Sequence, residues 1–354
     1  MKRIGKKLSV FAVIFLLAFP VFAQIPTIDD MLDGVDRFSQ SLASSLPFNS
    51  TLGLNWSDAY IGPLFGLPPH IGVGFSSGFT TIPLNGLNGL LGLVMPGIDL
   101  GSVTDLLDGV IPEDLSTYIG FPLPAYTLEA RIGGFGIPFD IGVKYSFIEP
   151  QGLLDQYLPG FLPVNFNYML AGADVRLALI NPKVAPVKLS IGIGFNYLKG
   201  GISTTISGLD AVKFEFDDND TSHILSVSSP EVGLSWETKT IDAKAHLSFP
   251  LVIVTPYVGV GVSYGWSKAG FEINSTVYVD GQPINIGYVD ALDELGLSGV
   301  TSKGFSSIQM VEGFNFRAFG GISLDLFVIK LDTTLMYNIS DKTIGAQIGI
   351  RLQL

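Results

Sequence analysis

The sequence predicts an all-β protein: a transmembrane antiparallel up-and-down β-barrel of about twelve strands, with a range of ten to fourteen, and a short N-terminal helical segment. Three observations lead to this prediction. Stretches of about ten residues alternate between apolar and polar side chains, which is the period of a β-strand. The polar face of these stretches consists of Gly, Ser, Asn and ionised residues. Only 15% of the 354 residues are charged and 47% are hydrophobic, yet no apolar run beyond residue 23 is long enough for a membrane-spanning helix.

The first 23 residues have the features of a secretory signal peptide. A basic start precedes an apolar run over residues 8–19, and Ala23 is a small residue before the expected cleavage site at Gln24. An uncleaved N-terminal anchor is the alternative. The chain has no cysteine, which excludes a lipoprotein, disulfides and thiolate metal sites. We therefore expect a signal peptide (1–23), an N-terminal helical segment (24–48) and a barrel (49–354).

Alternation assigns the strands. The expected strands are 52–57, 71–76, 127–132, 139–147, 172–179, 187–197, 231–237, 241–249, 257–266, 314–325, 329–338 and 344–354. Aromatic residues gather near their ends, for example Trp56, Tyr60, Tyr145, Tyr264 and Trp266, as in the girdles of membrane barrels. A soluble sandwich also alternates, but its outer face is usually rich in Lys and Glu, whereas this polar face is small and Gly-rich. Because backbone groups in hydrocarbon must be paired, the sheet is expected to close.

The connections between these strands are uneven in length. Short ones are expected near 134–137, 181–185, 237–240 and 340–342, and long ones at 84–123, 149–163, 201–222 and 267–313. Membrane barrels place long loops outside and short turns in the periplasm. Twelve strands would send 267–313 outward but 84–123 and 201–222 inward. Either those two are periplasmic or one strand is miscounted, and 202–216 is the best place for an extra strand.

Residues 27–45 have apolar side chains at helical spacing, including Ile28, Leu32, Val35 and Phe38. Two positions are open for this helix: a plug inside the lumen, or a periplasmic cap over the barrel mouth. Residues 84–97 are apolar with regularly spaced glycines, and 99–114 suggest a second short helix. That loop would either line a site for an apolar ligand or dip into the membrane interface.

Catalytic and metal motifs are absent from the sequence, so we predict no enzyme activity, no cofactor and no metal site. His246 and Ser248 share one face of a strand, as in some outer-membrane lipid hydrolases, but the alternation turns both toward the lumen instead of the lipid. The acidic turn Asp217–Asp220 lacks the ligand spacing and the Gly of a calcium loop. A net charge of −12 argues against nucleic acid as a partner.

Ionised residues on the polar face are the candidates for the lumen wall. They are mixed in sign and are accompanied by Glu129 and Glu231. The lumen-lining candidates are Arg131, Asp140, Lys144, Asp174, Arg176, Lys188, Lys244, His246, Arg317, Lys330, Asp332 and Arg351. In a water-filled pore such charges tune ion preference, and in a small barrel they pair and fill the lumen.

The leader, the Gly-rich strands, the helical N-terminal stretch and the segment from Asn55 to Gly62 (Asn-Trp-Ser-Asp-Ala-Tyr-Ile-Gly) resemble uncharacterised outer-membrane barrels of diderm bacteria. They are also loosely similar, in architecture, to the long-chain fatty-acid transporter family. That resemblance implies a fourteen-stranded barrel with an N-terminal hatch. The Asn-Pro-Ala hatch motif is absent, and the chain ends in Leu354 where the usual barrel-assembly signal ends in Phe or Trp. No functional residue is carried over.

These features predict an outer-membrane protein that forms a passive channel or transporter for small or hydrophobic solutes. The alternative is a surface-exposed structural or adhesive protein without transport activity. The expected partners are outer-membrane lipid, the barrel-assembly machinery and a small or apolar solute, without nucleic acid. The oligomeric state stays open.

Overall fold

A computed structural model describes residues 28–65, 69–83, 120–148, 164–181, 187–205, 212–218, 221–279, 282–283, 300–301 and 304–354. The expected signal peptide (1–23), the apolar stretch 84–97 and the expected second helix at 99–114 lie outside these residues. One helix, α2 (Ile28–Ser50), precedes the strands. The ten barrel strands are β1 (Ile71–Ile82), β2 (Phe121–Gly133), β3 (Phe139–Ile148), β4 (Val164–Ile180), β5 (Lys188–Thr205), β7 (Thr221–Ser248), β8 (Val254–Val279), β11 (Gly304–Leu326), β12 (Ile329–Asn338) and β13 (Thr343–Gln353).

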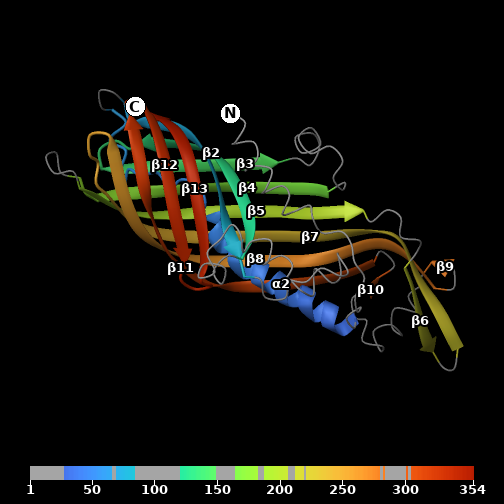
Figure 1. Cartoon of the computed structure of the whole chain (residues 1–354). Helices are drawn as coiled ribbons and strands as arrows, with labels where there is room; N and C mark the ends of the chain where they lie inside the picture. The colour runs from blue at the N-terminus through green and yellow to red at the C-terminus, as the bar shows by residue number, and fades with distance from the viewer. Residues whose placement is uncertain are drawn as a thin grey trace, which may run out of the picture.

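The sheet closes into an antiparallel barrel, as the sequence predicts (Figure 1). Each strand pairs with the next barrel strand, and β13 pairs with β1 from Gly72↔Gln353 to Thr80↔Gly345. Closure leaves no free edge around the part of the barrel that all ten strands share, so the backbone groups there find partners in the wall. Three short strands lie outside the circuit: β6 (Val212–Asp218) on β7, β9 (Gln282–Pro283) on β8 and β10 (Val300–Thr301) on β11.

Ten strands are the lower end of the expected range, and two specific assignments account for the difference from twelve. The expected turn at 237–240 does not exist, because β7 runs unbroken through it. Its polar residues are explained by position: Glu237 pairs with Lys268 at 2.9 Å, while Thr238 and Thr240 face the interior. The expected strand 52–57 is irregular chain, in which Gly53 and Leu54 have φ values of +82° and +58° that no extended strand allows.

With ten strands, every long connection falls at the same end of the barrel. We call this the long-loop end (connections 83–120, 149–163, 206–220, 280–303 and the turn 339–342) and the opposite one the short-turn end (134–138, 181–187, 249–253 and 327–328). Much of 201–222 and 267–313 is strand, because β7, β8 and β11 continue beyond the other strands (Figure 1). The expected extra strand in 202–216 corresponds in part to β6, which lies outside the barrel circuit.

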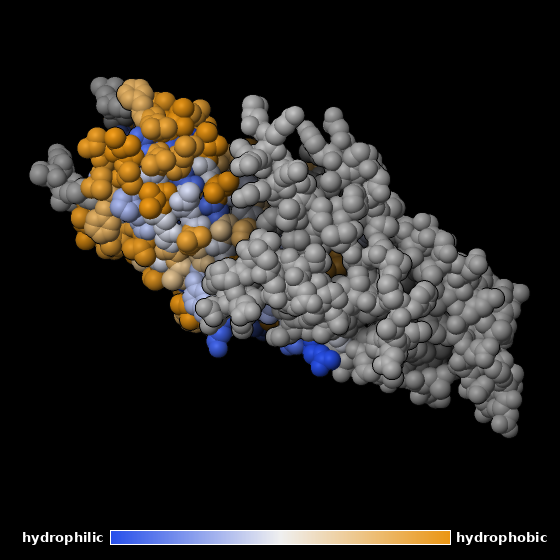
Figure 2. All heavy atoms as spheres, in the orientation of Figure 1, coloured by the Kyte–Doolittle hydropathy of each residue, from blue (hydrophilic) through white to orange (hydrophobic). Residues whose placement is uncertain are grey.

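The outer face of the barrel is apolar. Exposed Ile, Val, Leu and Phe side chains cover it over the part of the barrel next to the short-turn end (Figure 2). Examples are Val73, Ile193, Val260 and Ile348. Toward the long-loop end an aromatic level on β8, formed by Tyr264 and Trp266, is followed by the exposed Lys268. Trp56 and Tyr60, which the sequence suggested for this girdle, are instead buried inside. Within the described residues, no helix is long and apolar enough to cross a membrane.

Residues 28–65, which we call the N-terminal segment, pass through the lumen. Helix α2 starts at the long-loop end, where Asp36 accepts a hydrogen bond from Ser307. Its apolar face, spaced as Val35, Phe38, Leu42 and Leu46, is buried, since side chains three and four positions apart share one side of a helix. Irregular chain then continues to the short-turn end, next to the start of β1.

Candidate functional site

The lumen is divided into two compartments of opposite character. At the long-loop end, α2 packs against an apolar inner wall, in which the wall residues include Tyr168, Leu170, Leu198, Trp236 and Ala269. The short-turn half is lined instead by ionised side chains. Full burial of each large apolar side chain of α2 contributes about 1.5–3 kcal/mol, so the helix is held mainly by apolar contact.

Five wall residues form a continuous ion-pair chain in the ionised compartment. Arg131 on β2 lies 2.5 Å from Asp140 on β3 and 2.7 Å from Asp174 on β4. Arg176, also on β4, binds both oxygens of the Asp140 carboxylate, with Nε 2.9 Å from Oδ1 and Nη2 2.9 Å from Oδ2. The chain continues to β7, where Lys244 lies 2.8 Å from Asp174. Buried charges are tolerated only when paired in this way, so loss of any one member would leave a neighbouring charge buried without its partner.

The wall cations also bind peptide oxygens of the N-terminal segment. Lys144 Nζ donates to the carbonyls of Ser50 at 2.7 Å and Leu52 at 2.5 Å. Arg176 Nη1 donates to the Asp58 carbonyl at 2.7 Å. In return, the segment donates from Ile61 N to Asp140 at 3.2 Å. The irregular chain thus satisfies its backbone groups with wall side chains, which is why it needs no strand pairing.

Asp58 is the main ionic contact between the segment and the wall. Its carboxylate lies 2.8 Å from Lys330 Nζ, 3.0 Å from Arg351 Nη2 and 3.9 Å from Lys188 Nζ. Gln353 Nε2 donates to it at 3.1 Å. The donors come from β12 and β13 and from β5. One carboxylate therefore ties the segment to two separate parts of the wall.

Trp56 provides a second anchor. The guanidinium carbon of Arg351 lies 4.8 Å from its ring centroid and that of Arg131 5.6 Å, so the indole contacts two cations. Its Nε1 donates to Glu129 Oε2 at 2.6 Å, and Glu129 also accepts from Thr127. The indole therefore satisfies its donor and shields two buried guanidinium groups.

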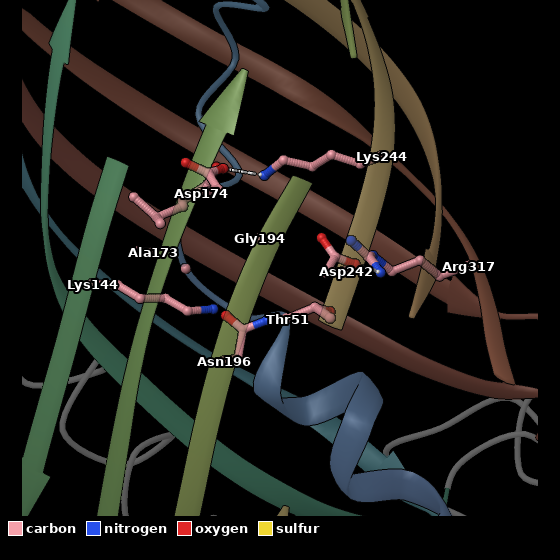
Figure 3. A pocket seen from close by; sticks show the side chains of 11 residues that line it. Thr51, Lys144, Ala173, Asp174, Gly194, Asn196, Asp242, Lys244 and Arg317 are labelled. Atoms are coloured by element: carbon pink, nitrogen blue, oxygen red, sulfur yellow. Dashed lines mark hydrogen bonds and ion pairs between the residues drawn. The ribbon is translucent and has the colours of Figure 1, made fainter. Parts of the chain in front are cut away.

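Little space remains between the segment and the wall. A small cavity of about 10 Å³ lies beside residues 51–54, with Lys144, Asp174, Asp242, Lys244 and Arg317 among its lining side chains (Figure 3). Arg317 Nη1 lies 2.6 Å from Asp242 Oδ1. The charges that line this cavity are thus engaged with one another or with the segment, so the segment obstructs this part of the lumen.

The structure places the lumen-lining candidates on the inner face. Ten are buried, and Lys188 and Lys330, at the short-turn end, are partly exposed. Of the two accompanying glutamates, Glu129 is buried; the side chain of Glu231 is outside the described set. The candidates did not include Asp242, which the same alternation places on the polar face, or Asp58, which directly follows the expected strand 52–57.

His246 and Ser248 have no catalytic arrangement. The Ser248 hydroxyl accepts a hydrogen bond from the Ala59 peptide at 3.0 Å, and the His246 ring packs 5.3 Å from Tyr257 and 5.7 Å from Phe319. Among the described residues, no three His, Asp or Glu side chains converge as a metal ion requires.

No protein-family model matches the chain, and no curated protein is significantly similar to it. Three solved structures illustrate the matches found by fold. The outer-membrane protease OmpT of Escherichia coli has a TM-score of 0.38 at 9% identity, covering 84% of this chain and 100% of OmpT. The attachment invasion locus protein Ail of Yersinia pestis has 0.25 at 7% identity, covering 80% and 95%. The toluene transporter TbuX of Ralstonia pickettii has 0.23 at 7% identity, covering 80% and 89%.

Similarities this weak assign no activity, and they do not support the finer resemblance to the fatty-acid transporter family. The class of the protein follows from its own structure. It is a closed antiparallel β-barrel with an apolar outer face, and its N-terminal segment fills the lumen.

Proposed function

We propose that this chain is an outer-membrane β-barrel of a diderm bacterium, and that small or apolar solutes pass its lumen when the N-terminal segment moves. The apolar outer face supports the location. From Leu189, the first outward-facing residue of β5, to the exposed Lys199, the strand rises by ~23 Å at ~3.3 Å per residue and a ~45° tilt, which is close to the height of the apolar band of such barrels. The long-loop end would face outward, and the partners would be membrane lipid and the barrel-assembly machinery.

The observation that carries the proposed passage is the apolar compartment around α2. A lumen that served only water-soluble ions would have a polar wall throughout, whereas Leu170, Leu198 and Trp236 face the helix. When α2 leaves, these side chains form a chamber suited to an apolar solute. The segment has no strand pairing with the wall, so its displacement does not require the barrel to open.

A reversible lock tests this proposal. Ser50 Oγ on the segment lies 3.1 Å from Thr240 Oγ1 on β7, and the chain contains no cysteine of its own. In the S50C/T240C variant, oxidation should tie the segment to the wall, since the two side chains already meet. We expect the reduced protein to let arabinose swell proteoliposomes, or to pass the apolar fluorophore N-phenyl-1-naphthylamine, and the oxidised protein to stop doing so.

The two single-cysteine variants are the matched controls, because oxidation should leave their permeation unchanged. Permeation that persists in the oxidised double variant would show that solutes do not need the segment to move. If neither probe passes in either state, the structural or adhesive function is favoured instead. That second candidate has one specific observation behind it: strands β7, β8 and β11 extend past the other strands of the barrel.

A further inference from the structure

We propose that the short-turn end of the lumen contains an anion-binding site of the barrel wall, in which Asp58 acts as a built-in ligand. A free carboxylate or another small anion would replace it when the N-terminal segment moves. Only that movement rests on the proposed function; the site itself rests on the geometry around Asp58.

The donors of the site all belong to the wall. Lys330 Nζ, Arg351 Nη2 and Gln353 Nε2 lie 2.8, 3.0 and 3.1 Å from one oxygen of Asp58, and Lys188 Nζ lies 3.9 Å from the other. Strands β12 and β13 are paired on both sides, and Lys188 on β5 is paired with Ser248 of β7. The acceptor, in contrast, sits on irregular chain. The donors therefore stay in place when the acceptor leaves.

The charge balance favours an anion in the vacated site. Lys330 has a second carboxylate at 3.4 Å, Asp325, and Arg351 has one at 3.0 Å, Asp332. Within the described part of the chain, Lys188 has no other ion-pair partner. Without Asp58, three cations thus face two carboxylates, an excess of one positive charge. A buried uncompensated charge is unfavourable, so a monovalent anion is the ligand that restores the balance.

Two further features suit a ligand from solution. Arg351 Nη1 is buried without a hydrogen-bond partner among the described residues, so the site has a spare donor. The side chains of Lys188 and Lys330 are 25% and 14% exposed, whereas that of Arg351 is 1% exposed. The site is therefore reached from the short-turn mouth and is desolvated at its inner end, where charge-assisted hydrogen bonds are strongest.

Chemical rescue tests the site without reference to transport. The D58A variant should lose its folded gel band at a lower temperature than wild type, and sodium acetate or formate should raise that midpoint. The wild-type chain and the D58A/R351Q variant, in the same salts, are the controls for screening by salt and should not gain. D36A is a second control, because Asp36 is a segment carboxylate at the opposite end.

Acetate that shifts D58A no more than wild type, or D58A/R351Q as much as D58A, would overturn the site. If D58A does not fold by itself, the acetate dependence of its folding yield in detergent is the same measurement. Planar-bilayer recordings of D58A in a KCl gradient separate the two proposals. We expect a reversal potential displaced toward that of chloride. Rescue without any conductance would contradict the passage alone, and conductance without rescue would overturn the anion site alone.

Discussion

Asp140→Ala should destabilise the barrel more than any surface substitution. The Asp140 side chain is fully buried and joins Arg131 at 2.5 Å to Arg176 at 2.9 Å. It also accepts the Ile61 peptide at 3.2 Å, so it couples the wall to the N-terminal segment. The substitution removes one negative charge from between two guanidinium groups.

The stability lost in Asp140→Ala follows from the partners that Arg131 and Arg176 keep without Asp140. Arg131 keeps its bond to Asp174 at 2.7 Å, whereas Arg176 keeps, among the described residues, only its hydrogen bond to the neutral carbonyl of Asp58. One buried cation is thus left uncompensated, which costs about 3–5 kcal/mol. At 1.4 kcal/mol per factor of ten, the folding equilibrium constant falls by roughly 10² to 10³ or slightly more. Asp140→Asn keeps the shape and one acceptor, so its loss should be smaller.

Urea unfolding in detergent micelles, followed by the mobility of folded and unfolded bands, measures this difference. Asp341→Ala is the matched control, because Asp341 lies in a turn and accepts hydrogen bonds only from the amides of Asn315 and Asn338 among the described residues. Protease digestion of the N-terminal segment should also speed up in the Asp140 variants. An Asp140→Ala barrel that unfolds within about 1 kcal/mol of wild type would show that the ion-pair chain does not hold the lumen together.

Three further substitutions test the outer face, the anchor and the packing of the wall. Ile348→Arg places a charge on an outer side chain that is 65% exposed and should cost ~2–4 kcal/mol in vesicles; unchanged folding there would mean that this face does not meet lipid. Trp56→Ala removes a buried indole and should cost about 3–5 kcal/mol, read from thermal band shifts, and full stability would argue against a seated segment. Gly142→Val brings a Cβ to 2.6 Å from Arg131 Nη2 and should lower the free energy of unfolding in urea by about 1–3 kcal/mol. Gly313→Ala is the control, because a Cβ there meets open space and should leave stability unchanged. Equal effects of the two substitutions would contradict the wall packing.

The alternation of side chains determines the fold class and the two faces of the wall. Along β13, Ile348, Ile350 and Leu352 are exposed and Gln347 and Arg351 are buried, which is the assignment that period two predicts. The same pattern predicts closure, since an apolar outer face has no place for an open sheet edge. These conclusions need only the sequence, because they depend on neighbours along one strand.

Strand boundaries depend on more than the local pattern. Residues 237–240 are polar enough for a turn, yet β7 continues through them. They lie on the long-loop side of the apolar band, where they are paired with β8. Residues 52–57 alternate like a strand, yet the ladders of the wall already close without them, and the left-handed Gly53 and Leu54 turn the chain into the lumen. Apolar and polar side chains alternate wherever successive residues face two different surroundings. A segment that lies in the lumen between opposite walls can show this alternation as well as a strand can.

The contacts in the lumen were decided by the tertiary structure alone. The sequence indicates that Arg131, Asp174, Lys244 and Arg351 face inward, but not which carboxylate each cation meets. Arg131 reaches two strands away to Asp174, and Arg351 meets Asp58 from a segment that lies 293 residues earlier in the chain. Such pairs depend on the barrel radius, the register of each ladder and the path of the N-terminal segment. All three are set by closure of the whole sheet, which no local stretch of sequence encodes.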